Sequence, residues 1–203
     1  IRIIPYGDRY LLVGCGKIKP PFKGVNADRI AIYSTQNFKE VTYHGMVAEF
    51  DSRNSFPFPE EIDGKLYMLL RFHPNINLDV LEAGVDQLLN PGKHRDRWRL
   101  MYERRDETIL IEAGRFLHER EKVGAGPPPI KTDKGWLLIY HGVEAKTWTY
   151  RLGYALLDKE RPEHVLYRCE EPILEPEEEY ERKGVAPNVV FSCGHAIVNG
   201  NLV

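Results

Sequence analysis

The stretch PPIKTDKGWLLIY at residues 128–140 contains a pattern that recurs along this chain: a proline-ended segment, a tight turn with Gly or Asp, and a short apolar strand. The same order occurs in IIPYGDRYLLV at 3–13 and in FPEEIDGKLYMLL at 58–70, and a shortened copy runs from VVF at 189–191 to NGNLV at 199–203. Asp-Gly and Asn-Gly between apolar runs are typical of hairpin turns, because these residues tolerate a positive φ. We therefore expect four β-hairpins.

The spacing of these hairpins indicates the architecture. The copies lie roughly 55 to 70 residues apart, which is about one four-stranded propeller blade with its connections. Residues 29–34, 150–157 and 165–168 have the apolar pattern of the remaining blade strands. We expect an all-β fold, a β-propeller of which this chain supplies about three to four blades. The chain starts at Ile1 and both ends fall within strand-like patterns, so we expect a partial, single propeller domain over 1–203 with its first and last blades missing or truncated.

One region departs from the strand pattern. Between residues 78 and 89 the apolar side chains recur with a period close to 3.6, at Leu78, Leu81, Val85, Leu88 and Leu89. This period predicts a short amphipathic helix over 78–89, stopped by the Asn-Pro-Gly of residues 90–92. We expect its apolar stripe to pack on the propeller.

Composition excludes several classes of protein. The chain is 42% hydrophobic and 29% charged with a net charge of −2, and the basic run at 94–105 is interleaved with acids, so a nucleic-acid partner gets no support. No apolar run reaches the length of a membrane span. The three cysteines, Cys15, Cys169 and Cys193, have no C-x-x-C spacing, which argues against zinc and disulfides and favours a reducing, cytoplasmic setting.

The loop before the third hairpin is unusual for a purely structural turn. Two glycines precede three prolines in VGAGPPPIKT at 123–132, a combination that lets backbone approach a ligand closely and then stiffens the chain. Lys131 and His141 flank this hairpin, so both could face one end of the ring. Alternatively, Lys131 is a surface lysine and His141 a strand-end histidine with its hydrogen bonds satisfied.

Residues 123–194 resemble glycoside hydrolase family 130, the β-mannoside phosphorylases and mannosidases. The resemblance runs in order through residues 124–143, 150–158, 172–176, 180–184 and 187–194, with weaker matches at 51–74. It implies a five-bladed propeller and an inverting reaction at the anomeric carbon of a β-linked mannose. The family's general acid is an aspartate just ahead of a strand start that Arg2 and Ile3 fit, so the resemblance places the catalytic aspartate before Ile1.

The resemblance also implies a phosphate pocket. Arginine suits such a pocket because its planar fork donates two parallel, charge-assisted hydrogen bonds to an oxyanion. The positions similar to the family's phosphate-binding residues are Arg29, Arg53, Arg71, Lys131 and His141. Arg29 could instead pair with Asp28 or Asp8. No motif-matched carboxylate presents itself as the base that an inverting hydrolase needs.

Four further positions match the family near the sugar pocket: Asn54, Tyr140, Glu181 and Asn188. Tyr140 could stack on a sugar, although a strand tyrosine is also a common packing residue. Glu181 ends a charged run from residue 175 that is typical of solvated surface.

The sequence is thus interpreted as a phosphorylase of β-mannosides or β-mannooligosaccharides that gives α-mannose 1-phosphate. Its partners would be the oligosaccharide and inorganic phosphate as co-substrate, with no other cofactor, no metal, no nucleic acid and no membrane; a homo-oligomer is compatible with this interpretation. Two alternatives stay open: a phosphate-independent β-mannosidase on the same fold, and a non-catalytic glycan-binding propeller.

Overall fold

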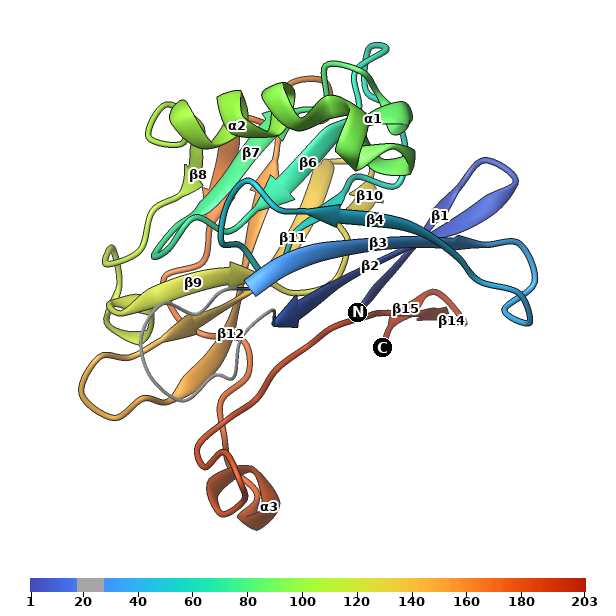
Figure 1. Cartoon of the computed structure of the whole chain (residues 1–203). Coiled ribbons are helices and arrows are strands. Elements are labelled where there is room, and N and C mark those ends of the chain that lie inside the picture. Colours follow the sequence, from blue (N-terminus) through green and yellow to red (C-terminus); the bar gives the residue numbers. More distant parts are fainter. Residues whose placement is uncertain (18–27) are drawn as a thin grey trace. The chain divides into compact units, whose positions relative to one another are not determined.

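The computed structural model describes residues 1–17 and 28–203. They form two compact units, Ile1–Phe72 with Asn77–Ile109 and His73–Ile76 with Leu110–Val203. Antiparallel sheets dominate both units (Figure 1), which confirms the all-β prediction. The assignment of all 203 residues to a single domain stays a prediction.

The first sheet of unit 1 is a four-stranded meander in the order β1-β2-β3-β4. Its strands are β1 (Arg2–Tyr6), β2 (Arg9–Lys17), β3 (Asp28–Thr35) and β4 (Thr42–Val47). Buried and half-buried residues alternate strictly along most of β3, so one face of this strand carries Ile30 and Ile32 into the core. The predicted hairpin at 3–13 is confirmed, with Gly7 at φ 59° in its turn.

The second sheet has the order β5-β6-β7-β8. It comprises β5 (Phe56–Pro57), β6 (Tyr67–Leu70), β7 (Ile76–Val80) and β8 (Ile109–Ile111). Asp63 and Gly64 both have positive φ, 50° and 67°, which confirms the predicted hairpin turn in 58–70. Side chains from both faces of β6 are buried, so this strand lies in the core of unit 1.

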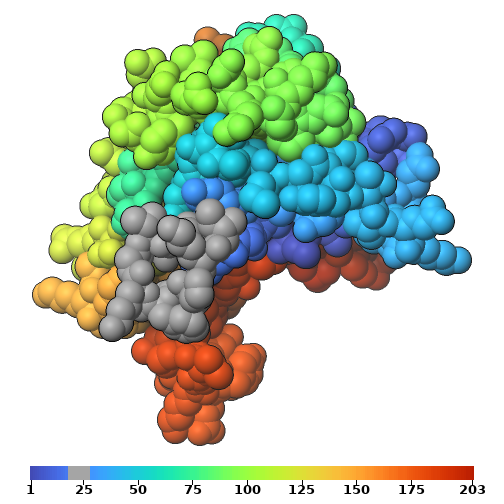
Figure 2. All heavy atoms as spheres, viewed as in Figure 1, coloured from blue at the N-terminus to red at the C-terminus, as the bar shows by residue number. Residues whose placement is uncertain are grey.

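A helical segment comprising α1 (Val85–Leu89), the 3₁₀ turn η1 (Pro91–His94) and α2 (Arg95–Glu103) is inserted between β7 and β8. It forms a continuous green surface in Figure 2. The helix predicted over 78–89 is present, but it starts at Val85, because residues up to Val80 continue β7 instead. In β7 the apolar residues Ile76, Leu78 and Val80 alternate with Asn77 and Asp79, so Leu78 belongs to a strand period of two and matched the helical period by coincidence.

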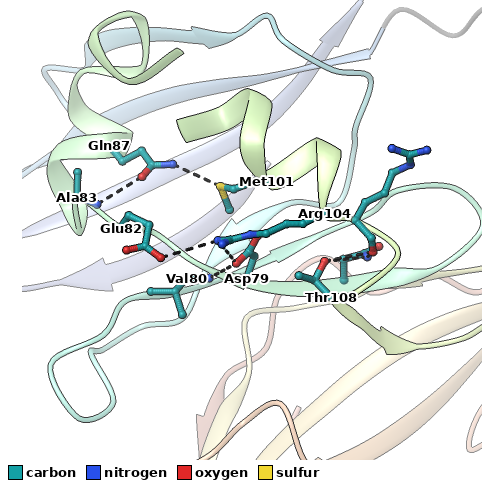
Figure 3. Close-up of polar contacts among 10 residues, drawn as sticks. Asp79, Val80, Glu82, Ala83, Gln87, Met101, Arg104 and Thr108 are labelled. Atoms are coloured by element: carbon teal, nitrogen blue, oxygen red, sulfur yellow. Dashed lines mark hydrogen bonds and ion pairs between the residues drawn. The ribbon is translucent and has the colours of Figure 1, made fainter. Parts of the chain in front are cut away.

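Polar contacts join α1 to α2 and join the end of α2 to β7 (Figure 3). The fully buried Gln87 of α1 donates to Sδ of Met101 in α2 at 3.4 Å. Arg104, at the end of α2, grips Asp79 of β7 with two hydrogen bonds, from Nε at 2.9 Å and from Nη2 at 2.6 Å. These hydrogen bonds raise the pKa of Arg104 and keep a buried carboxylate paired.

Unit 2 contains a five-stranded sheet in which β10 (Ile130–Thr132), β11 (Gly135–Val143), β12 (Tyr150–Leu157) and β13 (Val165–Arg168) follow in order. β9 (Lys122–Ala125) pairs with the second half of β11, and β10 pairs with the first half. The prolines 127–129 separate these two strands, because proline has no N–H to continue the ladder. The predicted hairpin at 128–140 is confirmed.

The short turn η2 (Leu117–Glu119) packs against β11 at Gly142. A Cβ on Gly142 would lie 2.7 Å from Cβ of Glu119 and 2.8 Å from the carbonyl oxygen of His118, so this approach requires glycine. Further along the chain come α3 (Glu179–Arg182) and the hairpin β14 (Ile197–Val198) with β15 (Asn201–Leu202). The turn and second strand of the fourth predicted hairpin are confirmed, but its first strand is Ile197–Val198 and not 189–191. Among the described residues, no helix is long and apolar enough to span a membrane.

Candidate functional site

A buried carboxylate at the start of β3 organises the charged cluster of unit 1. Asp28 is 1% exposed and lies in the same phase of the strand as Ile30, so its side chain points into the buried face. Lys17 is its direct neighbour on β2, and Nζ of Lys17 lies 3.0 Å from Oδ1. Nη2 of Arg53 donates to Oδ2 of the same carboxylate. One buried acid therefore binds two cations from different segments.

Two of the predicted phosphate ligands, Arg53 and Arg71, are connected through Ser52. The Ser52 hydroxyl donates to the carbonyl of Arg71 at 3.1 Å and accepts from its N–H at 3.3 Å. The backbone N–H of Ser52 donates to the carbonyl of Asp28 at 3.2 Å. Since Arg53 follows Ser52 directly, the backbones of both arginines are anchored on one scaffold at the start of β3.

The Arg53 guanidinium is only partly used by these contacts. Its Nε is buried, and none of the residues in 1–17 and 28–203 accepts a hydrogen bond from it. The side chain as a whole is 30% exposed. A buried donor without an acceptor is costly, and an oxyanion would supply the missing acceptor. Arg53 thus has the properties of an anion ligand.

Arg29 leaves β3 on the opposite face from Asp28, because neighbouring side chains alternate along a strand. Its Nη1 donates to the Asp28 backbone carbonyl at 3.0 Å. Arg29 therefore contacts Asp28, as one of the alternatives suggested, but it binds the main-chain carbonyl. The Asp28 carboxylate binds Arg53 instead. No contact links the Arg29 guanidinium to Arg53 or Arg71 among the hydrogen bonds and ion pairs of the described residues, and its phosphate role stays a prediction.

Asn54 shapes the loop that carries Arg53. Its φ of 53° lies in the left-handed region, which asparagine tolerates better than most residues. This bend brings Oγ of Ser55 to 2.8 Å from Oγ of Ser52. Asn54 therefore has a clear structural role, and its predicted sugar contact stays a prediction.

In unit 2, His141 and Asn188 meet at Tyr150. His141 is 3% exposed on β11, and its ring lies 5.7 Å from the ring of Tyr150 and 4.5 Å from that of Phe191. The carbonyl of Asn188, a residue with φ of 60°, accepts from the N–H of Tyr150 at 2.9 Å. Both predicted residues thus belong to one local constellation around the start of β12.

Lys131 lies elsewhere on the same sheet. It pairs with Trp136 near the first end of β11, whereas His141 pairs with Gly124 near the other end. Five residues of strand separate the two positions, about 17 Å. The interpretation that Lys131 and His141 face one end is therefore wrong. Lys131 is exposed, and its ammonium group lies 5.6 Å from the centre of the Trp136 ring, a cation–π contact.

Tyr140 is fully buried, so the prediction that it contacts a sugar is wrong. Its hydroxyl donates to Oε2 of Glu119 at 3.1 Å and accepts from Nε of Arg168 at 3.2 Å. Arg168 also pairs with Glu119. Burial, with the Glu119 charge beside it, raises the pKa of Tyr140 above its usual value. This network joins η2 to two strands of the sheet and is structural.

The carboxylate of Glu181 caps its own helix. It accepts the backbone N–H groups of Glu177 and Glu178 at 2.9 and 3.0 Å. These hydrogen bonds, that of Glu178 first, lower the pKa of Glu181. The side chain is thus engaged locally, as the surface alternative suggested, and its predicted role at a sugar stays a prediction.

Sequence reasoning missed Asp28 and Ser52 as parts of the site. Asp28 entered only as a partner for Arg29, and Ser52 had no role. One signal could have identified Asp28: an acidic residue in the buried phase of the alternating pattern D-R-I-A-I at 28–32 indicates a buried charge that must be paired. Ser52 carried no such signal, because its partner Arg71 is 19 residues away.

Other chemistries have little support in the part of the chain that the structure describes. No group of three or more His, Cys, Asp or Glu side chains could hold a metal ion there. Cys15 lies beside Asp28, and partial burial together with this carboxylate raises the pKa of the Cys15 thiol. A protonated thiol is a poor nucleophile, so oxyanion binding is the chemistry that this cluster supports best.

The fold as a whole is that of a known class of carbohydrate-active proteins. The solved structure of beta-1,2-mannobiose phosphorylase from Listeria innocua, in complex with beta-1,2-mannobiose, superposes with a TM-score of 0.73 at 29% identity, over 96% of this chain and 50% of that one. Proteins of this class are five-bladed β-propellers. The prediction of propeller blades is confirmed: the described residues form three sheets of four or five strands and the two-stranded hairpin β14-β15.

The chain belongs to glycoside hydrolase family 130. The family model described as beta-1,4-mannooligosaccharide phosphorylase matches residues 2–203. A 1,2-beta-oligomannan phosphorylase of Thermoanaerobacter sp. (strain X514) is 38% identical over 169 residues, which cover 83% of this chain and 51% of that protein. The beta-1,2-mannobiose phosphorylase of Listeria innocua is 37% identical over 175 residues, 84% of this chain and 44% of that protein. The chain thus spans about half the length of the curated relatives it matches.

Proposed function

We propose that the protein cleaves β-mannosides or β-mannooligosaccharides by inverting phosphorolysis. Family membership and the phosphorylase activities named for the relatives in two bacteria support this proposal. The observation that carries it is local: Arg53 and Arg71 are anchored on one scaffold, and Arg53 keeps a buried donor without an acceptor among the described residues. A hydrolase does not need such a site.

The proposed reaction exchanges one bond at the anomeric carbon for another. A phosphate oxygen attacks this carbon from the face opposite the leaving sugar, the glycosidic C–O bond breaks, and a proton is delivered to the leaving oxygen. Inversion of a β-linkage gives α-mannose 1-phosphate and a chain shorter by one mannose. Arg53 and Arg71 hold and orient the phosphate dianion, which is mainly a contribution of positioning and charge stabilisation. The aspartate that the family resemblance implies stays the predicted proton donor.

Incubating the full-length protein with β-1,2- and β-1,4-mannobiose, with and without inorganic phosphate, tests the proposal. We expect mannose 1-phosphate to form in amounts equal to the released mannose, and only when phosphate is present. Equal release of free mannose in both tubes would instead establish the β-mannosidase alternative. Binding of mannobiose without any cleavage would establish the glycan-binding alternative.

A further inference from the structure

The carboxylate at the centre of the cluster has no function assigned by the proposed reaction. Asp28 is nearly fully buried, and it binds the guanidinium of Arg53, whose Nε has no acceptor among the described residues. Its backbone carbonyl accepts hydrogen bonds from Ser52 N–H and from Arg29 Nη1. Both the main chain and the side chain of Asp28 therefore contact the loop that carries Arg53.

We infer that Asp28 is a positioning residue for the anion site: its carboxylate binds one nitrogen of Arg53 and thereby directs Nε toward the bound phosphate. This inference rests on the proposed function and extends it. An arginine side chain has many rotamers, and holding it in one of them before the ligand arrives lowers the entropic cost of binding. Asp28 is suited to this because β3 fixes its own position.

Charge alone would give the opposite effect. A carboxylate close to a phosphate dianion repels it, so an Asp28 that acted only as a nearby negative charge would weaken phosphate binding. Nζ of Lys17, 3.0 Å from Oδ1, offsets this charge. Removing the Asp28 charge therefore distinguishes the two roles by the sign of the change: positioning predicts weaker phosphate binding, and simple repulsion predicts tighter binding.

Asp79 provides a matched control. It is also a buried aspartate on an arginine, in the same unit, but Arg104 uses both Nε and Nη2 on its two oxygens and presents no such donor. Asp28→Asn and Asp79→Asn thus remove the same charge from similar surroundings. A general loss of stability would affect both variants, whereas a positioning role affects Asp28→Asn alone.

The experiment measures phosphate binding by calorimetry and the KM for phosphate, the KM for mannobiose and kcat of the full-length protein. For Asp28→Asn we expect the phosphate Kd and KM to rise about tenfold or more, the range for a lost hydrogen bond between charged groups, with the mannobiose KM within about twofold. Asp79→Asn should lower the urea midpoint and leave the phosphate Kd unchanged. Circular dichroism checks that each variant is folded.

Asp28→Glu keeps the charge but moves the carboxylate by one methylene, and it covers the case in which Asp28→Asn does not fold. We expect it to raise the phosphate Kd less than Asp28→Asn does. If the wild-type protein binds phosphate and either folded variant binds it equally well or more tightly, the inference is wrong while the proposed function stands. If the wild-type protein binds no phosphate, both are wrong.

Discussion

Two buried aspartates in unit 1 each bind an arginine, yet the two pairs differ in how many hydrogen-bond donors of the guanidinium have an acceptor. In the closed pair, Asp79 and Arg104, two nitrogens of the guanidinium meet two oxygens of the carboxylate. In the open pair, Asp28 and Arg53, one nitrogen meets one oxygen, and Nε has no acceptor among the described residues. The arginine side chains are almost equally exposed, at 28% and 30%.

Burial therefore does not distinguish a structural pair from a ligand-binding pair, whereas hydrogen-bond satisfaction does. Both nitrogens on one edge of the Arg104 guanidinium already bind Asp79, so an added anion would gain no hydrogen bond on that edge. This pair instead fixes the end of α2 on β7. In the Arg53 guanidinium the buried Nε lacks an acceptor among the described residues until a ligand supplies one. The closed pair should thus determine stability, and the open pair should determine activity.

Breaking the closed pair should give the largest effect on stability. Arg104→Ala leaves Asp79 buried and unpaired, and we expect the free energy of unfolding to fall by about 3 kcal/mol, the lower end of the range for such pairs because Arg104 is partly exposed. Urea unfolding measures it. The control is Arg99→Ala on the same helix, whose partner Asp96 is exposed, with an expected change within about 0.5 kcal/mol. Equal changes in both variants would contradict the distinction.

This helical segment also shows how far sequence alone could go. The hairpin turns were readable, because Asp63-Gly64 and Asn199-Gly200 encode positive φ locally. The start of α1 was not, since Leu78 and Leu81 fit a helical period while tertiary burial made residues up to Val80 a strand. Local rules predict turns well, but they do not decide between helix and strand where every side chain is buried.

Arg53→Lys should have the second largest effect, on phosphate rather than on stability. A lysine can keep the ion pair with Asp28 but lacks the second donor of the fork. We expect the KM for phosphate to rise about 10- to 100-fold, equivalent to about 1.4–2.7 kcal/mol, with little change in the urea midpoint. Arg104→Lys is the control and should leave the phosphate KM unchanged. An equal phosphate KM in both variants would show that Nε of Arg53 binds no anion.

The parts of the site that could not be predicted depend on contacts between distant residues. Tyr140 was assigned to a sugar, but Glu119 and Arg168, 21 and 28 residues away, bury its hydroxyl. Arg53 and Arg71 were found by resemblance, whereas the aspartate and the serine that hold them were not. Motifs identify residues that touch ligands, and the residues that position those side chains become visible only once the chain is folded.

Removing the Ser52 hydroxyl should have a smaller effect, and this effect should be seen in both stability and phosphate binding. Ser52→Ala removes the donor to the Arg71 carbonyl and leaves the Arg71 N–H without this acceptor. We expect a loss of about 1–2 kcal/mol in unfolding free energy and a rise in the phosphate KM of less than tenfold. Ser192→Ala, which removes a hydroxyl that donates to the Gly194 carbonyl, is the control and should change neither quantity appreciably. A phosphate KM unaffected by Ser52→Ala would mean that Arg71 is placed without this scaffold.

An exposed acid completes the series and should give the smallest effect. Hydrogen bonds from His94, Asn90 and Lys93 lower the pKa of Asp86 to about 2. A depressed carboxyl pKa favours the folded state above the usual value near 4, and this contribution is lost as the pH falls from about 4 to about 2. The urea midpoints of wild type and Asp86→Asn should therefore differ slightly at pH 7 and converge toward pH 2. A difference that stays constant over this range would show that the Asp86 charge is not what stabilises the turn, and that even an exposed acid here acts only through its hydrogen-bond geometry.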